Sequence, residues 1–551
     1  MRTWTFHRKG SAMLALGLLL LIGLPLYGAD DNSPTMTSGQ AIRFAVSPPL
    51  RELAKVPGPP AYGFHQAHSV RRANIHPGAF RQVDPVEQNS PGPPTSITTG
   101  LSLLGLDNAE SCGCEPPDTN AAVGDTQVVE WVNVAYAVYN KSTGAMVLGP
   151  VQGNLLWQSL GGACFNDNDG DIIAQWDRTA HRWLLSQNVF EGPPYYACVA
   201  VSTSSDATGS YYEYQFPLGN DFPDYPKWGI WPTGYFETNN AFPNIGNGYV
   251  NVCAYNSAKL LVGDRSAEQI CFQTSTNDTS LLPGDLDSHT PPPANQDEFF
   301  IGSYLEDPNN SHLYLYSMHP VYSNPSQSTF AGNNLANPIA VPAYTPFCPL
   351  SEFCVPQNGT TEKVDALGDR VMYRFSYWDD GPLANIQPTA GRAVAQHWYV
   401  NHVVTASGNQ AGVRWYEFRA NVRTSTISDV RLFQSGTFAP DSNYRWMASV
   451  AQDKVGDIAV GYSLSSTSVF DSIYMAGRVP TDPLGQLETE VPLTVGTGSQ
   501  SGGDRWGDYS SMMIDGTDGC TFWYTQEYYI TPAGGSQWQT RLNSFKFNSC
   551  H

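Results

Sequence analysis

Residues 127–148 read QVVEWVNVAYAVYNKSTGAMVL, and this stretch indicates which kind of fold the chain adopts. Residues 127–139 are mostly β-branched, aromatic or small and apolar, which is the composition of a strand. The turn Asn140-Lys-Ser-Thr-Gly144 follows, and Ala145–Leu148 then has the composition of a returning strand. The stretch therefore predicts a β-hairpin.

Similar hairpins recur along the rest of the chain. They are expected at 172–188, 449–462 and 512–525, and a last strand is expected at 541–547. Six or seven such units fit between residues 120 and 549, and repeated units of about four strands are typical of a β-propeller. We therefore predict an all-β fold, a six- or seven-bladed β-propeller, with a pair of β-sandwiches as the alternative.

The composition argues against several classes of protein. Gly (50) and Pro (41) are frequent among the 551 residues and aromatic residues reach 12%, which argues against a helical bundle and against a disordered chain. Lys and Arg total 29 against 50 Asp and Glu, a formal net charge of −21, so no nucleic-acid partner is expected. The sequence also lacks H-E-x-x-H, G-x-x-x-x-G-K-[ST] and G-x-G-x-x-G motifs, which weakens metalloprotease and nucleotide-binding interpretations.

The first 29 residues have the features of a secretory signal peptide. Arg2, Arg8 and Lys9 make the start basic, Met13–Pro25 is apolar, and Tyr27-Gly-Ala29 offers a cleavage site. A membrane anchor is the alternative, but the apolar run is shorter than the roughly 20 residues that span a bilayer. We therefore expect a secreted protein, extracellular or periplasmic, that is monomeric and has no membrane span after signal cleavage.

Three segments follow from these patterns. Residues 1–29 form the signal peptide, and residues 30–100, which contain several Pro pairs and little periodicity, form a linker or pro-segment. Residues 101–551 form the β-propeller domain.

Ten cysteines follow the signal segment, and an even number in an exported chain favours disulfides. Proximity in the sequence suggests the pairs Cys164–Cys198, Cys253–Cys271, Cys348–Cys354 and Cys520–Cys550. Cys112 and Cys114 are left, either as a tight loop or with other partners. A metal site at Cys112-Gly-Cys114 is the alternative, but no second cysteine pair has zinc-ligand spacing.

Three segments carry a family resemblance: Glu115-Pro-Pro-Asp-Thr-Asn-Ala-Ala-Val-Gly124, Arg445-Trp-Met-Ala-Ser449 and Arg505-Trp-Gly-Asp-Tyr-Ser-Ser-Met512. Over roughly residues 100–551 the chain resembles a group of secreted bacterial β-propeller proteins of poorly known activity. The hairpins are also loosely similar to the sialidase-like propeller superfamily, which contains glycosidases, polysaccharide lyases and binding propellers. The Ser-x-Asp-x-Gly-x-Thr-Trp boxes of sialidases occur only in degenerate form at 453–456 and 518–523, so no sialidase active site is carried over.

Asp118 and Asp508 are the carboxyl pair that we expect to act as acid and base on a glycosidic bond, with Tyr509 as a further catalytic candidate. In a propeller the innermost strands of different blades begin at one mouth of the channel, so residues distant in sequence meet there. Arginine recognises carboxylates with two parallel hydrogen bonds. The expected substrate-binding residues are Arg374, Arg445 and Arg505. The alternative is that these Asp and Arg residues pair with one another and hold the blades together.

The acidic loop 166–171 is a candidate calcium site. Asp167, Asp169 and Asp171 offer hard oxygen ligands of the kind that Ca²⁺ selects, and an Asx-rich turn with solvated charges is the alternative. His397 and His402 are separated by an odd number of residues, so they face opposite sides of a strand, which argues against a shared metal site.

The many aromatic residues allow two interpretations, stacking on sugars or packing between sheets. The ones considered are Trp228, Trp231, Tyr235, Trp378, Trp398, Trp415, Trp446, Trp506 and Trp523.

Two hypotheses about function follow. In the first, the protein is a secreted carbohydrate-active enzyme, a glycoside hydrolase or polysaccharide lyase, that cleaves a polysaccharide or oligosaccharide at the propeller mouth. In the second, it is a non-catalytic extracellular binding or adhesion propeller. An open mouth with unpaired carboxylates would favour the first hypothesis.

Overall fold

The computed structural model describes residues 35–54, 83–246, 248–274, 280–293, 295–303, 310–330, 337–348, 353–381, 396–420, 429–530 and 537–551. Within these residues the chain is almost entirely β, as the sequence predicts. The helical elements are the short α1 (Leu50–Leu53), α2 (Ala163–Asn166) and α3 (Ser257–Leu260), with the 3₁₀ turns η1 (Gly153–Trp157) and η2 (Pro325–Gln327). In this part of the chain no helix is long and apolar enough to cross a membrane. The predicted signal peptide lies outside the described residues.

Three antiparallel sheets make up the first half of the chain. The first contains β5 (Thr119–Val123), β6 (Gln127–Val132), β7 (Ala135–Asn140) and β8 (Met146–Gln152). The second contains β9 (Ile173–Asp177), β10 (Arg182–Val189), β11 (Tyr195–Ser202), β12 (Tyr211–Gly219) and β2 (Arg43–Val46). The third contains β13 (Phe222–Trp231), β14 (Gly234–Phe242), β15 (Tyr249–Tyr255), β16 (Glu268–Gln273) and β1 (Met36–Gln40).

A parallel pairing of β17 (Leu282–Leu286) with β24 (Met372–Asp379) joins the next two groups of strands into one ten-stranded sheet. On the β17 side lie β18 (Glu298–Ser303), β19 (His312–His319), β20 (Thr329–Phe330) and β21 (Asn337–Ala340). On the β24 side lie β25 (Gln396–Thr405), β26 (Ala411–Ala420), β27 (Val430–Phe438) and β3 (Glu87–Gln88).

Two four-stranded sheets and one small hairpin complete the fold. The first contains β28 (Tyr444–Gln452), β29 (Ile458–Ser466), β30 (Val469–Arg478) and β31 (Val491–Thr494). The second contains β32 (Ser511–Ile514), β33 (Phe522–Tyr528), β34 (Gln539–Phe547) and β4 (Ile97–Asp107). The hairpin pairs β22 (Val355–Pro356) with β23 (Lys363–Val364).

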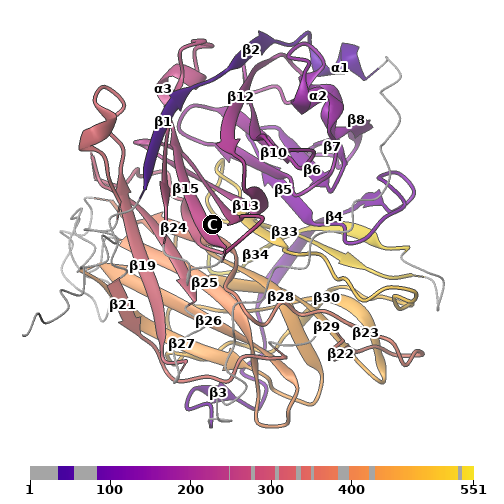
Figure 1. The fold of residues 1–551 in the computed structure, drawn as a ribbon. Coiled ribbons are helices and arrows are strands. Elements are labelled where there is room, and N and C mark those ends of the chain that lie inside the picture. The colour runs from indigo at the N-terminus through magenta and orange to yellow at the C-terminus, as the bar shows by residue number, and fades with distance from the viewer. Residues whose placement is uncertain are drawn as a thin grey trace, which may run out of the picture.

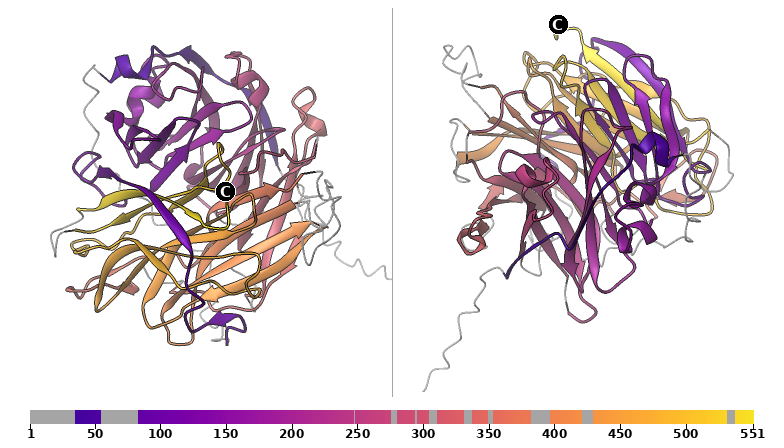
Figure 2. Two further views of the ribbon diagram at one scale, coloured as in Figure 1. Left: turned by 180° about the vertical axis from the view of Figure 1, so that it is seen from behind. Right: turned by 90° about the horizontal axis from the view of Figure 1, so that it is seen from above.

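The first strands of these groups, β5, β9, β13, β17, β24, β28 and β32, contact one another in chain order, and β32 contacts β5. Figure 1 shows the sheets following one another around the molecule, with the C-terminal strands beside β4; Figure 2 shows them from behind and from above. The first strand β5 is buried along its whole length, which explains why its sequence TNAAV is small and does not alternate between polar and apolar residues. The starts of strands far apart in the sequence therefore lie close together.

The segment expected to be a linker or pro-segment contributes strands to the sheets. β1 pairs with β16 and β2 pairs with β12, each as an antiparallel outer strand, and β4 pairs with the C-terminal strand β34. An added edge strand is held mainly by backbone hydrogen bonds and buries little side chain, so its sequence carries a weak pattern. The part of the segment between α1 and residue 83 lies outside the described residues.

The aromatic residues that were considered for sugar stacking are all buried. They pack within and between sheets; for example, the rings of Trp446 and Trp506 lie 5.3 Å apart, between sheets that are neighbours in the chain. Burial of large rings is a main source of stability in such folds. Among these residues, packing is the interpretation that the structure supports.

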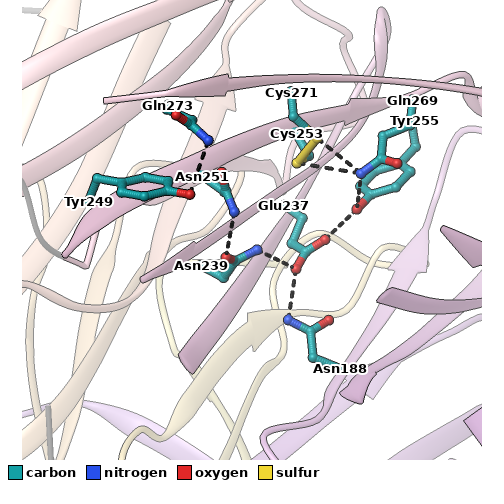
Figure 3. The surroundings of a disulfide bond; sticks show 10 residues. All are labelled: Asn188, Glu237, Asn239, Tyr249, Asn251, Cys253, Tyr255, Gln269, Cys271 and Gln273. Atoms are coloured by element: carbon teal, nitrogen blue, oxygen red, sulfur yellow. Dashed lines mark hydrogen bonds between the residues drawn. A yellow bond between two sulfur atoms is a disulfide. The ribbon is translucent and has the colours of Figure 1, made fainter. Parts of the chain in front are cut away.

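All ten cysteines are paired. The four pairs expected from the sequence are present, and Cys112 pairs with Cys114. Figure 3 shows the Cys253–Cys271 disulfide, whose residues lie directly opposite each other on β15 and β16. Beside it, the Glu237 carboxylate of the third sheet accepts hydrogen bonds of 3.0 Å from Asn239 and from Asn188 of the second sheet. Buried polar contacts thus join neighbouring sheets.

Replacing both Cys164 and Cys198 with alanine is expected to lower the free energy of unfolding by about 2–4 kcal/mol. The bond joins α2 to β11 across a sequence separation of 34, so its loss frees a long loop in the unfolded chain. The same double replacement at Cys112 and Cys114, separated by only two positions, should cost much less. Guanidinium titrations without reductant measure the free energy of unfolding of both double variants. Equal losses of stability in the two variants would contradict the explanation by loop length.

Candidate functional site

Charged residues gather where the first strands begin. Asp118 directly precedes β5, Asp171 lies two residues before β9, and Asp508 lies three residues before β32. The Asp508 backbone N–H donates to Asp118 Oδ1 at 3.2 Å, and the Tyr225 N–H of β13 donates to Asp171 Oδ2 at 3.0 Å. Four strand starts are therefore joined at one place. The central cluster, as we call this group, consists of Asp118, Asp171, Asp224, Lys227, Arg370, Arg505 and Asp508.

The backbone of the central cluster adopts a rarely populated conformation. Asp118 and Asp171 both have φ of 49°, and Tyr225 has φ of 58°. Non-glycine residues in this left-handed region cost energy and concentrate at sites where function fixes the geometry. Asp118 and Asp171 lie just before first strands, and Tyr225 lies where the pairing of β13 with β14 is irregular, between Asp224 and Lys227. The same conformation at these three positions points to a positional requirement for the side chains.

Lys227 is fully buried in the middle of the cluster. Its Nζ lies 3.3 Å from the ring centroid of Tyr225 and 4.0 Å from that of Tyr509, and it donates to the Pro226 carbonyl at 2.9 Å. Burial lowers the pKa of Lys227 to about 8, although Asp171, Asp508 and Asp118 act in the opposite direction. The two tyrosine faces hold a cation beside the carboxyl groups.

Burial and neighbouring carboxyl groups favour the protonated form of two aspartates in the cluster. Burial, and after it Asp508 and Asp171, raises the pKa of Asp118 well above its ordinary value. Burial, together with Asp171 and Asp508, does the same to the pKa of Asp224. Among the described residues, Asp224 Oδ2 is buried and has no hydrogen-bond partner.

Asp118 and Asp171 influence each other's protonation. Burial and then Asp508 raise the pKa of Asp171, whereas Lys227 and a hydrogen bond with Asp118 lower it. The charge of Asp171 in turn contributes to the raised pKa of Asp118. Neighbouring carboxyl groups whose environments push their pKa values apart can divide the roles of acid and base.

Asp508 is bound by an arginine. Arg505 Nη2 lies 2.5 Å from Asp508 Oδ1, and the Arg505 Nε is buried without a hydrogen-bond partner in the described part of the chain. Arg370 forms two hydrogen bonds, of 2.9 and 3.1 Å, with Asp369, and its Cζ lies 4.8 Å from the Tyr225 ring centroid. The guanidinium groups of Arg505 and Arg370 are thus each held in place by a nearby carboxylate.

Glu115 lies on the partly exposed side of the cluster. Its carboxylate accepts a hydrogen bond of 2.7 Å from Gln500. Burial, and then the charge of Asp504, raises the pKa of Glu115 to about 7. A carboxyl group with this pKa exchanges protons near neutral pH, which is what a general acid or base must do.

Raising the pH from 5 to 9 is expected to lower the melting temperature. Burial raises the pKa of Glu130 to about 7 and that of Glu213 to about 8. Above pH 4.5 the unfolded chain has lost these protons while the native protein still holds them, so the native state loses stability as the pH rises. Glu213→Gln replaces this carboxyl group with an amide that does not titrate. The melting temperature of this variant should therefore fall less steeply between pH 5 and 8. A melting temperature that rises across this range would contradict the prediction.

Of the three arginines expected to bind substrate, only Arg505 lies in the central cluster. Arg374 pairs with Asp285 at 2.7 Å and with Asp287 at 2.8 Å, and donates to the Met512 carbonyl at 2.7 Å. Arg445 pairs through Nε and Nη2 with the two carboxylate oxygens of Glu490 at 2.8 and 2.7 Å. Both are buried and held by carboxylates elsewhere in the fold, as in the alternative in which Asp and Arg residues pair with one another.

Tyr509 is in the cluster, but its hydroxyl is engaged. It donates to the Ile172 carbonyl at 2.8 Å, and the side chain is fully buried. Burial raises the pKa of Tyr509 well above its ordinary value. The ring face contacts Lys227, so the geometry places Tyr509 as a support for that cation.

The three aspartates of the acidic loop point to different partners. Asp167 Oδ2 accepts the N–H groups of Phe190 at 2.7 Å and Glu191 at 3.0 Å, whereas Asp171 faces the central cluster. Burial, and then a hydrogen bond with Asp167, raises the pKa of Asp169 to about 9. Within the described ranges no group of three or more His, Cys, Asp or Glu residues is placed to hold a metal ion. Calcium binding stays a prediction.

His397 and His402 have separate surroundings, as their spacing predicts. His397 lies between Asp380 and Glu417, with N–O distances of 3.0 Å to each. His402 Nε2 lies 2.9 Å from the Tyr416 hydroxyl.

Two residues of the central cluster, Asp224 and Lys227, were not among the residues predicted to form the site. The dipeptide Asp224-Tyr225 recurs as Asp508-Tyr509, and this repeat could have drawn attention to residues 224–227.

Comparisons with known proteins give a limited result. No protein-family model matches the chain, and no curated protein matches it. Among solved structures, the chain is similar to the polysaccharide lyase Uly1, with 10% identity over 82% of this chain and 100% of that chain and a TM-score of 0.38. It is also similar to an endo-arabinase from Bacteroides thetaiotaomicron VPI-5482, with 10% identity over 61% and 95% of the two chains and a TM-score of 0.25.

A third similar structure is the subtype N10 neuraminidase-like protein of A/little yellow-shouldered bat/Guatemala/060/2010, with 8% identity, coverage of 67% and 95% and a TM-score of 0.29. Likenesses at this level of identity and TM-score identify neither a family nor an activity for this chain.

Proposed function

We propose that the protein is an exported carbohydrate-active enzyme that cleaves a glycosidic bond of an oligosaccharide or polysaccharide at the central cluster. The observation that carries the proposal is the hydrogen bond from the Asp508 backbone N–H to Asp118, which brings a carboxyl group with a raised pKa beside Asp508, a carboxylate held by Arg505. Glycosidic cleavage needs one carboxyl group that gives a proton and one that acts as base or nucleophile. Two carboxyl groups in different environments meet that need.

In this proposal Asp118 protonates the glycosidic oxygen and Asp508 acts on the opposite side of the bond. Arg505 holds the Asp508 carboxylate in position at 2.5 Å. Lys227, fixed between the rings of Tyr225 and Tyr509, supplies positive charge that balances the cluster as the proton moves. Glu115, on the partly exposed side, exchanges the proton with solvent.

The fold inference behind this proposal is a seven-bladed propeller. The seven first strands contact one another in chain order and the last contacts the first, which supports a closed ring around the cluster. The last blade would then combine the N-terminal strand β4 with C-terminal strands. Five disulfides agree with export to an oxidising compartment.

The burial of the carboxyl groups favours a second candidate function, a non-catalytic glycan-binding propeller. Asp118 and Asp508 are only 2% and 6% exposed, and each is hydrogen-bonded inside the protein. In that case the cluster would join the blades and a glycan would bind elsewhere on the surface.

Product release from a panel of neutral and acidic polysaccharides tests the proposal. Reducing ends report hydrolysis, ultraviolet absorbance of unsaturated products reports elimination, and retention of each glycan on immobilised protein reports binding. Release of either product supports the enzyme. Retention without release would favour the binding propeller, and neither release nor retention on any glycan would overturn a carbohydrate role.

A further inference from the structure

A pocket separate from the central cluster lies between the β24–β27 strands and the β28–β31 sheet. It encloses about 370 Å³, within the usual size range of small-molecule sites. The pocket is beside the ends of β24 and β28, at Asp380 and Gln452, whereas the central cluster lies at the strand starts. The pocket and the central cluster therefore lie at opposite ends of these strands.

The polar wall of the pocket follows from strand register. His397 pairs with Arg419, and Tyr399 with Glu417, across β25 and β26. Because alternate residues of a strand share a face, these four side chains project from the same side of the sheet. Opposite them, the β28–β31 sheet contributes Arg478, which pairs with Ile458 across β29 and β30.

The charges on this wall are largely balanced. Burial would lower the pKa of His397, but hydrogen bonds with Asp380 and Glu417 raise it. Glu417 is the acceptor for His397 and for Arg419, and despite burial these partners lower its pKa to about 2. Glu417 is thus an ionised carboxylate neutralised by two cations.

Arg478 differs from these paired residues because one of its N–H groups has no acceptor in the described part of the chain. It is 3% exposed, its Nη2 donates to the Asp482 carbonyl at 2.8 Å, and among the described residues its Nε is buried with no acceptor. Burial lowers the pKa of Arg478, although Glu417 and Asp482 act in the opposite direction. A buried guanidinium with an unused N–H is costly unless an acceptor reaches it.

The rest of the pocket wall combines apolar side chains with the polar side chains of Gln452 and Asp482. Phe433, against which the Arg419 guanidinium stacks at 3.4 Å, forms one side. Leu484, which is 59% exposed, lies at the rim. A molecule entering over Leu484 would meet apolar side chains in the pocket that Arg478 lines.

We propose that this pocket binds a small molecule bearing an oxyanion, with the anion on the Nε side of the Arg478 guanidinium and its uncharged part against Phe433. One edge of an arginine guanidinium can bind a carboxylate or sulfate by donating two parallel hydrogen bonds. The same chemistry is offered by an acidic sugar residue and by a free inorganic or organic anion. This proposal does not depend on whether the central cluster is catalytic.

Isothermal titration calorimetry of the full protein with glucuronate, sulfate and neutral glucose tests the inference. Glucuronate should bind, and Arg478→Gln should weaken its binding about 10- to 100-fold. Arg541→Gln, which replaces a partly buried arginine on β34, is the matched control and should bind as the wild type does. Sulfate binding as tightly as glucuronate would identify a free oxyanion as the ligand, whereas tighter glucuronate binding would identify an acidic sugar.

A second variant covers the case in which Arg478→Gln does not fold. Leu484→Glu places a negative charge at the exposed rim and should weaken glucuronate binding without disturbing the core. No binding of either anion to the wild type, equal binding of glucose, or full binding by Arg478→Gln or by Leu484→Glu would overturn the inference.

Discussion

Replacing Asp508 with asparagine is expected to slow glycosidic cleavage by about 10²–10⁴-fold, the usual contribution of a positioned acid or base. Asparagine has the same shape as aspartate, so the Arg505 contact and the backbone hydrogen bond to Asp118 can persist. It cannot act as a base or nucleophile. The loss should appear in kcat more than in KM, because the carboxylate acts on the transition state.

The matched control is Asp264→Asn. Asp264 lies in a partly exposed turn, and its carboxylate accepts hydrogen bonds from the backbone N–H and the hydroxyl of Ser266. This variant should cleave at the wild-type rate. If Asp508→Asn keeps more than about a tenth of the wild-type kcat with an unchanged melting temperature, Asp508 has no direct part in the chemistry.

Replacing Arg374 with methionine is expected to lower the free energy of unfolding by about 3–5 kcal/mol, the usual cost of removing one partner of a buried ion pair. Arg374 is 4% exposed and is the cation between the buried carboxylates Asp285 and Asp287. Arg178 lies 3.1 Å from Asp287 and compensates only part of the loss. Without Arg374, Asp285 is left buried beside a like charge.

Neutralising the carboxylates separates charge from packing. In the Arg374→Met background, Asp285→Asn should recover part of the lost stability, because no unpaired buried charge is then left. Urea titrations of the wild type, the single variant and the double variant give the three free energies. An Arg374→Met variant within 1 kcal/mol of the wild type would show that the Arg374 ion pairs contribute little to stability.

The fold class could be predicted from the sequence because strands and turns leave local signals. The turn at Asn140 is where the sequence places it, but residues 127–139, expected to be one strand, form a hairpin of the two strands β6 and β7. Their apolar composition continues through the tight turn at 133–134, so the sequence does not mark that turn. The strands β1 and β2 were not predicted, because outer strands in this fold are held by backbone pairing that any sequence can supply. Which sheets lie next to one another depends on contacts between distant strands, which no local pattern encodes.

The central cluster could be predicted in part. Asp118 and Asp508 meet, as expected for residues that precede first strands. Arg374 and Arg445 also lie in first strands, but the carboxylates of Asp285 and Glu490 take their hydrogen bonds. A sequence does not reveal which Arg is already paired, because these partners are 89 and 45 residues away in the chain. Lys227 shows the converse case, a buried lysine that only the two Asp-Tyr dipeptides could have indicated.

A crystal structure of Asp508→Asn with an oligosaccharide from the panel tests most directly whether the central cluster is the working site. The fragment used should be the one that the wild type cleaves, or binds most tightly if none is cleaved. The predicted result is a sugar ring in contact with Asp118 and Arg505, with its glycosidic oxygen within hydrogen-bond distance of the Asp118 carboxyl group. A glycan bound on the outer faces of the sheets, with the central cluster unchanged, would contradict a catalytic role and leave the cluster as a joint between blades.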